Sequence, residues 1–194
     1  LNVGIGAYHG ADIAPVQHSA GRLAGKRALF LHQNAAKLRN DSDGRGRLAD
    51  GMGGYKAGEV ASGIAVRTVL TLVKDAVDRE DLSLSDEVNG LSRPGILLRD
   101  AIQRANKVIF QTARTQSNCE GMGTTVVAGL FFDDKLTIAH VGDSRLYRCR
   151  DGKLEQVTQD HSLLQELVSR GFYTPEEAQR AAAKNYVTRA LGVE

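Results

Sequence analysis

The sequence has few of the residues that mark specialised classes of protein. Only two of its 194 residues are cysteines, Cys119 and Cys149, and no CxxC pair occurs, so neither a zinc site nor a disulfide framework is indicated. No apolar run approaches the roughly 18 residues of a membrane span. The N-terminus lacks the basic start and long apolar stretch of a signal peptide. We therefore expect a soluble protein in a reducing, cytoplasmic setting, without a membrane partner.

The chain also lacks a strong charge of either sign. Its formal net charge of +2 is too small to indicate nucleic-acid or membrane binding by itself. The densest basic cluster is Arg39, Arg45 and Arg47, and no aromatic residue interleaves with it, so we expect no nucleic-acid partner. A hydrophobic content of 42% and a charged content of 25% are those of an ordinary globular domain that can bury a core.

Apolar periodicity predicts two helices in the middle of the chain. Apolar residues recur at helical spacing between Val66 and Val77, which predicts a helix over about 57–79. A second stripe, from Leu98 to Ile109, predicts a helix over about 96–116. Residues 1–47 have little periodicity, and the only strand that we predict there is 28–32.

The second half of the chain predicts antiparallel strands followed by short helices. β-Branched and aromatic runs indicate strands over 124–132, 135–141 and 144–150, and a hairpin turn at Asp151-Gly152 leads into a fourth. Asp160 or Ser162 is expected to cap the next helix, which Gly171 ends, and Thr174 with Glu177 forms a capping box for the last one. Helices combined with antiparallel strands predict an α+β fold.

One glycine-rich motif carries candidate chemistry. In LADGMGGYKAGEVAS (residues 48–62) a single carboxylate, Asp50, is followed by three glycines within four residues. Backbone without a Cβ can pass close to an ion that the carboxylate reaches, and oxygen ligands favour Mg²⁺ or Mn²⁺. The motif is not a dinucleotide fingerprint, because Lys56 replaces the third glycine, and Arg45 rules out a calcium loop. Taken alone, it is more often a helix N-cap with a glycine-rich turn.

Two further motifs complete a set. GMGTTVVAGLF spans residues 121–131, and in VGDSR Asp143 follows a glycine at the end of a predicted strand. Asp143 alone is more often a turn residue, but the three motifs in this order resemble the metal-dependent protein phosphatases of the PPM (type 2C) family, particularly its bacterial members. The resemblance covers about residues 48–194, which we take as the phosphatase domain, and residues 1–47 stay unassigned. Residues 185–194 are similar to the segment that follows the family's mobile flap.

The resemblance implies a fold, a reaction and partners. The implied fold is an αββα sandwich of two stacked antiparallel sheets flanked by helices. The implied reaction, a step in signal transduction, is hydrolysis of phosphoserine and phosphothreonine in proteins by water activated between two Mn²⁺ or Mg²⁺ ions, with no phosphoenzyme. The partners would be phosphorylated proteins that a serine/threonine kinase supplies, and the protein is expected to be a monomer.

The same resemblance assigns residues to the site. Asp50 matches the catalytic carboxylate that bridges both metals, and Gly51 matches the residue whose carbonyl joins the metal shell. Asp143 matches the residue that helps to hold a third, more weakly bound metal in bacterial relatives. Glu59 and Ser62 are expected to order the following helix. His161 could be a general acid, but we interpret it as structural because it lies near a helix start.

The first family motif, R-x-x-N-E-D, fits only in part. Asn40-Asp41-Ser42 matches its second half, with Asp41 as a candidate metal ligand. Arg39, the candidate phosphate-binding residue, is adjacent to Asn40 instead of three residues before it. Eight residues separate Asp41 from Asp50, which we judge too few for the family's two-stranded hairpin. An internal deletion or a frame shift in this region is our hypothesis.

Two metal-binding aspartates that the family carries in S-D-G and D-N motifs have no counterpart before Glu194. We therefore expect a fragment with an incomplete sandwich and weak or absent activity. Two alternatives stay open, namely a non-catalytic pseudophosphatase that binds a phosphoprotein, and an α+β binding module in which the glycines form turns. Retention of both Asp50 and Asp143 favours the phosphatase.

Overall fold

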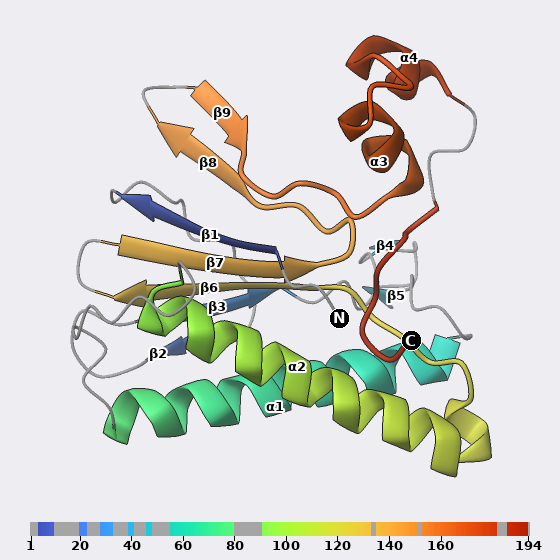
Figure 1. Ribbon diagram of the computed structural model, residues 1–194. Helices are drawn as coiled ribbons and strands as arrows, with labels where there is room; N and C mark the ends of the chain where they lie inside the picture. The colour runs from blue at the N-terminus through green and yellow to red at the C-terminus, as the bar shows by residue number, and fades with distance from the viewer. Residues whose placement is uncertain are drawn as a thin grey trace.

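The computed structural model contains both α-helices and antiparallel β-strands. The described residues are 4–9, 20–22, 28–32, 39–40, 46–47, 55–79, 91–132, 135–150, 153–181 and 186–193, with side chains described only within 57–193. Figure 1 shows one antiparallel sheet, two long helices along one of its faces, and a separate hairpin and helix pair. This arrangement confirms the α+β class.

The main sheet has five antiparallel strands in the order β1-β7-β6-β3-β2. At its centre, β6 (Val126–Phe132) pairs with β7 (Lys135–Val141), with Val126 opposite Val141 and Phe132 opposite Lys135. The strand predicted over 135–141 is confirmed, and the one predicted over 124–132 begins two residues later than expected. The predicted turn residues, 133–134, lie outside the described part of the chain.

Three strands from the N-terminal region join this sheet. The strand predicted over 28–32 is confirmed as β3 (Ala28–His32), which pairs with β6 on one side and with β2 (Ala20–Arg22) on the other. We did not predict β1 (Gly4–His9), which pairs with β7 along its whole length. Its sequence, GIGAYH, has few β-branched residues, so β7 and not local propensity determines that it is a strand.

The two long helices are antiparallel to each other and cover one face of the sheet (Figure 1). The helix predicted over 57–79 is α1 (Tyr55–Arg79), and the one predicted over 96–116 is α2 (Arg93–Thr115). α2 begins earlier than expected because the Ser92 hydroxyl accepts a hydrogen bond from the Gly95 amide, and Pro94 is tolerated in a first helical turn. In α1, the Ser62 hydroxyl donates to the Glu59 backbone carbonyl oxygen at 3.0 Å. The role that we predicted for Glu59 and Ser62 at the start of this helix stays a prediction.

The core lies between these helices and the sheet, and it consists mainly of aliphatic side chains. Its members include Val69, Val73, Leu98, Ala101, Ile102, Ile109, Met122, Val126, Ala128, Leu130, Ala139, Val141 and Leu191. The opposite face of β6 and β7 is also closed to solvent. Val127, Leu136 and Ile138 are at most 3% exposed although they do not belong to the core between helices and sheet.

A second, two-stranded sheet projects away from the main one. β8 (Tyr147–Arg150) pairs with β9 (Lys153–Gln156), which confirms the predicted hairpin, although the strand predicted over 144–150 begins only at Tyr147. The turn residues, 151–152, are outside the described residues.

The two short predicted helices follow the hairpin. Ser162, and not Asp160, caps α3 (Leu163–Ser169), and Gly171 follows its end with φ +76°. α4 (Pro175–Arg180) has the predicted capping box of Thr174 and Glu177.

A minimal hairpin lies near the segment that we judged too short for the family's two-stranded hairpin. β4 (Arg39–Asn40) pairs with β5 (Gly46–Arg47), and each strand has two residues. Only β5 lies between Asp41 and Asp50, so the expectation that those eight residues do not hold both strands is not contradicted.

The αββα sandwich is only partly visible in the described residues. They contain the five-stranded sheet with one helical layer and two sheets of two strands each, and no second large sheet. Of the helices described, none combines the length and the apolar character needed to cross a membrane.

Candidate functional site

Asp143 is the one predicted site residue whose side chain the structure describes. It lies two residues beyond the end of β7 and is half-buried. No described residue forms a hydrogen bond or ion pair with its carboxylate. The backbone of Arg39 lies in β4, while Asp41, Asp50 and Gly51 fall outside the described residues. The structure therefore does not show these residues gathered at one place, and the described residues hold no group of three side chains suited to a metal ion.

The turn that carries Asp143 depends on Gly142. This glycine has φ +107°, a conformation that residues with a side chain rarely adopt. A Cβ atom at this position would lie 2.5 Å from the Cβ atom of Thr125. The Thr125 hydroxyl in turn forms a buried 2.7 Å hydrogen bond with the Ser144 hydroxyl. The GTT and GDS motifs of the sequence therefore contact each other on both sides of Asp143.

His161 holds the same turn from a third direction. Its backbone amide donates to the Gly142 carbonyl oxygen at 3.0 Å, and its Nδ1 accepts a hydrogen bond from the Gly142 amide at 3.1 Å. The His161 carbonyl oxygen accepts from the Thr188 amide at 2.8 Å. These contacts agree with the structural role expected for His161.

The His161 ring also stacks on His140, with ring centroids 4.8 Å apart and planes inclined by 15°. Burial, and then the neighbouring His140 and Arg189, lower the pKa of His161 to about 4. The imidazole is therefore neutral at pH 7, as an Nδ1 atom that accepts a hydrogen bond requires.

Asp160, one residue before His161, differs from Asp143 because both of its carboxylate oxygens accept hydrogen bonds. Arg145 donates to both of its carboxylate oxygens, with Nη2 2.6 Å from Oδ2 and Nε 2.9 Å from Oδ1, and Gln156 donates to Oδ1 at 3.1 Å. The hydrogen bonds to Asp160 raise the pKa of Arg145 above its usual range. Of the two aspartates near this turn, only Asp143 keeps an unpaired carboxylate among the described residues.

The C-terminal segment returns to the same region. The Tyr186 carbonyl oxygen accepts from the Leu163 amide at 2.9 Å, and Thr124 and Leu191 exchange two backbone hydrogen bonds of 3.0 and 2.8 Å. The Gly192 amide donates to Oδ1 of Asn106 in α2 at 2.7 Å. This segment therefore ties α3, the GTT motif and α2 together.

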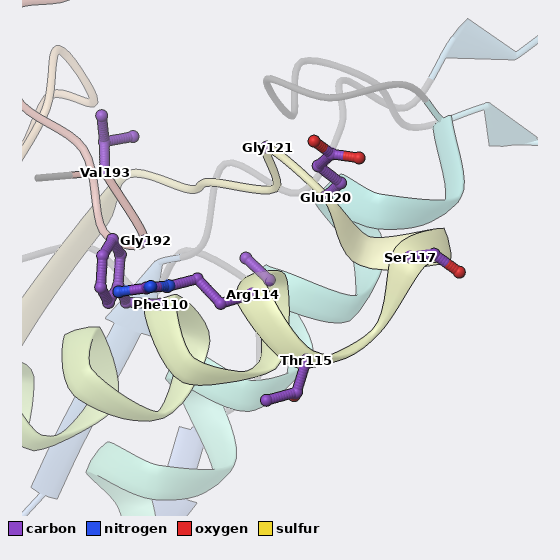
Figure 2. A pocket seen from close by; sticks show the side chains of 9 residues that line it. Phe110, Arg114, Thr115, Ser117, Glu120, Gly121, Gly192 and Val193 are labelled. Atoms are coloured by element: carbon purple, nitrogen blue, oxygen red, sulfur yellow. The ribbon is translucent and has the colours of Figure 1, made fainter.

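Two pockets lie near these elements. The first, of about 570 Å³, lies between the Arg145–Asp160 pair and the helices α3 and α4; its lining is Arg145, Asp160, Ser162, Leu164, Gln165, Val168, Pro175 and Ala178. The second, of about 630 Å³, lies at the C-terminal end of α2 (Figure 2). There the Arg114 guanidinium lies over the Phe110 ring at 5.7 Å, and Gly192 and Val193 form one wall.

Sequence reasoning missed several residues that shape the Asp143 turn. The Thr125–Ser144 hydrogen bond, the His140–His161 stack and the Asn106–Gly192 contact join residues 19, 21 and 86 positions apart. Only the first of the three joins residues inside the quoted motifs, which was the only signal available for it. Asn106 lies within a helical stripe and carries no such signal.

The chemistry open to this turn follows from its donors. An unpaired carboxylate oxygen is a hard ligand, which suits Mg²⁺ or Mn²⁺ better than a soft metal. The locked backbone limits the directions in which the Asp143 carboxylate can point. One carboxylate cannot hold two cations, so a metal centre here needs further oxygen donors.

Comparison with known proteins identifies relatives of this chain. Residues 31–189 match the family described as protein phosphatase 2C. The chain is 41% identical over 147 residues to the serine/threonine phosphatase stp of Listeria welshimeri, covering 76% of this chain and 55% of the relative. The chain thus spans about half the length of that relative.

The solved structures that this chain resembles are also serine/threonine phosphatases. The chain matches the serine/threonine phosphatase Stp1 of Staphylococcus aureus with a TM-score of 0.63 and 31% identity, covering 100% of this chain and 67% of the other. It matches the catalytic domain of the phosphatase PstP, in complex with two manganese ions, with a TM-score of 0.57 and 30% identity, covering 98% and 67%. Since the family match extends over more than half of the sequence and includes all three motifs, the chain belongs to the protein phosphatase 2C family.

Proposed function

We propose that this chain forms part of a metal-dependent phosphatase that hydrolyses phosphoserine and phosphothreonine in proteins. Membership of the protein phosphatase 2C family supports the reaction class, and so does the similarity to the serine/threonine phosphatase stp of Listeria welshimeri. The single observation on this chain that carries the proposal is the Asp143 carboxylate, unpaired among the described residues and mounted on a rigid turn after β7. Phosphorylated proteins, made by a serine/threonine kinase in a signalling pathway, would be the substrates.

Oxygen ligands from three parts of the chain would hold the cations. We propose the carboxylates of Asp50, Asp143 and Asp41 together with the Gly51 carbonyl, and Arg39 as a contact to the phosphate. The donors are all hard oxygens, which fits Mn²⁺ or Mg²⁺, and PstP was solved with two manganese ions. When bound, the cations supply an acidified water and neutralise charge on the phosphoryl oxygens.

The protein's own contribution would be a preorganised carboxylate. Gly142 is held by Thr125 on one side and by His161 on the other, so Asp143 is presented without a large loss of conformational freedom on binding. Asp160 would not compete for the cation, because Arg145 and Gln156 already occupy its oxygens.

We also propose that the complete fold is a two-sheet sandwich. The support is the likeness to solved protein phosphatases, of which this chain covers about two thirds. Val127, Leu136 and Ile138, on the face of the main sheet that the long helices do not cover, are already buried within this chain, as expected of a sheet with a layer on each face.

A non-catalytic phosphoprotein-binding protein is the second candidate. The observation in its favour is that no three metal-binding side chains gather among the described residues. An Asp143 carboxylate without a partner argues against it, because an unpaired half-buried charge costs stability and a binding protein has no need of it.

The test is Mn²⁺-dependent hydrolysis of a phosphothreonine peptide. We would compare the 194-residue chain with the same chain extended by the C-terminal segment of the Listeria welshimeri phosphatase. We expect slow or no turnover in the first protein and Mn²⁺-dependent turnover in the second, because two cations about 3.5–4 Å apart need several carboxylates to hold them.

Variants of the extended protein assign the activity to the site. Asp50→Asn and Asp143→Asn should each lower turnover, and Asp100→Asn is the matched control, since Asp100 is an exposed residue of α2 paired with Arg99. Turnover that needs no Mn²⁺, or that survives Asp50→Asn, would contradict the proposal. Peptide binding without turnover would favour the non-catalytic candidate.

A further inference from the structure

We propose that His161 is a positioning residue for Asp143, fixing the backbone of Gly142 so that the Asp143 carboxylate points in one direction. The inference rests on the proposed function, since it takes Asp143 as a metal ligand. Three observations carry it, namely the double hydrogen bond between His161 and Gly142, the stack of His161 on His140, and the conformation of Gly142.

The two hydrogen bonds from His161 engage both the amide and the carbonyl oxygen of Gly142. His161 Nδ1 accepts from the Gly142 amide at 3.1 Å while the His161 amide donates to the Gly142 carbonyl oxygen at 3.0 Å. The side chain and the backbone of one residue thus close a ring around the residue that precedes Asp143. Rotation of the peptide unit on either side of Gly142 would break one of these bonds.

The partners of the two rings determine where each proton lies. Because His161 Nδ1 accepts from an amide, a neutral His161 carries its proton on Nε2. His140 Nε2 lies 2.8 Å from the Gln159 carbonyl oxygen, so it is the donor of that pair. Gln159 lies two residues before His161, and the stack therefore joins β7 to the segment that leads into α3 at two points.

The need for such a clamp follows from Gly142 itself. A φ of +107° and the close contact with Thr125 both require glycine at position 142. Glycine is also the most flexible residue, so its backbone changes conformation easily unless other groups hold it. Without the His161 acceptor, the Gly142 amide would lose its partner and the direction of the Asp143 carboxylate would be less restricted.

Two substitutions separate the acceptor from the ring. His161→Phe keeps an aromatic ring that can stack on His140 but removes the Nδ1 acceptor. His161→Asn removes the ring but places Oδ1 close to the former position of Nδ1. A role in packing alone predicts that the Asn variant is the more damaged, whereas the positioning role predicts the reverse for metal binding.

The experiment measures Mn²⁺ affinity of the 194-residue chain from the relaxation rate of water protons. We expect His161→Phe to weaken binding roughly tenfold, the size typical of residues that orient metal ligands, and His161→Asn to stay within about threefold of the parent. The double variant His161→Phe/Asp143→Asn should bind no more weakly than Asp143→Asn alone, since the residue acts through Asp143. Hydrogen exchange of the Gly142 amide in metal-free protein should accelerate in His161→Phe and not in His161→Asn.

The outcomes separate this inference from the proposed function. Unchanged Mn²⁺ affinity in Asp143→Asn, or no binding by the parent, would overturn the metal assignment and this inference with it. If Asp143→Asn weakens Mn²⁺ binding but His161→Phe does not, the positioning role alone is overturned. The same holds if the double variant binds Mn²⁺ more weakly than Asp143→Asn. Equal exchange of the Gly142 amide in the Phe and Asn variants would also overturn it.

Discussion

Gly142 has a backbone conformation that other residues rarely adopt, and Thr125 fills the space where its side chain would begin. Gly142→Ala should therefore destabilise the protein by about 2–5 kcal/mol, because left-handed strain and a clash with Thr125 act together. The measurement is the free energy of unfolding in urea, followed by circular dichroism.

Gly171→Ala is the matched control for this substitution. Gly171 also has a positive φ of +76°, but nothing lies within 4 Å of a Cβ atom built there. It should lose only about 1–2 kcal/mol from the strain. Equal losses in the two variants would mean that the contact between Gly142 and Thr125 is unimportant.

His161 should make stability depend on pH below neutrality. The folded protein lowers its pKa to about 4 from an ordinary 6.5, so the folded state prefers the neutral ring. Its contribution is complete above pH 6.5 and is lost as the pH falls from 6.5 towards 4, because the unfolded chain binds the proton first. Among the neighbouring ionisable residues, His140 and Arg189 lower this pKa and Glu166 and Asp160 raise it.

We expect the Tm of the parent to fall over this pH range more steeply than that of His161→Asn, which keeps an acceptor for the Gly142 amide but does not titrate. Thermal unfolding at pH 7, 6, 5 and 4 measures the difference. Parallel curves for parent and variant would show that His161 does not carry this dependence.

At the scale of elements, the α3–α4 segment differs from the main sheet in how little of it is buried. α3 has no buried residue, and Phe172 and Tyr173 between the two helices are 70% and 41% exposed. In β6, Val126 and Leu130 are fully buried. Amide hydrogens of 163–181 should therefore exchange much faster than those of 126–132, because local opening there exposes little apolar surface.

Thr174→Ala should accelerate exchange within α4 further. Its hydroxyl accepts from the Glu177 amide at 3.2 Å, and its amide donates to the Glu177 carboxylate at 2.8 Å, so the substitution removes half of the capping box, worth about 1 kcal/mol. Exchange in β6 serves as the internal reference and should not change. Protection of α4 equal to that of β6 would contradict the prediction.

At the scale of the whole molecule, Asn106 joins two segments that are 86 residues apart. Its Oδ1 accepts from the Gly192 amide at 2.7 Å, and Gly192 has φ +87° beside Ile109 and Met122. Asn106→Leu should cost about 1–3 kcal/mol, since it leaves the partly buried Gly192 amide without an acceptor. Asn106→Asp, which keeps an acceptor oxygen at the same place, should lose less.

Urea unfolding of both variants is the measurement, with hydrogen exchange of the Leu191 and Gly192 amides as a local readout. A loss in Asn106→Asp as large as that in Asn106→Leu would show that the acceptor is not the reason for the effect.

The sequence by itself determined the features that depend on short stretches of chain. The periodicity of Val66–Val77 and Leu98–Ile109 predicts α1 and α2, and the β-branched run before Phe132 predicts β6, because an amphipathic pattern repeats within one element. The capping box at Thr174 is local for the same reason. The three motifs were sufficient to predict the family, since each is a continuous stretch.

Tertiary structure alone decided the features that depend on partners far along the chain. β1 is a strand because β7, more than 120 residues further along the chain, offers it hydrogen bonds. The sequence pointed to Asp143 as a ligand, but only the fold shows that Thr125, Ser144 and His161 surround its turn. Such contacts join residues about 20 positions apart, and no pattern within a single element encodes the direction from which a distant side chain will arrive.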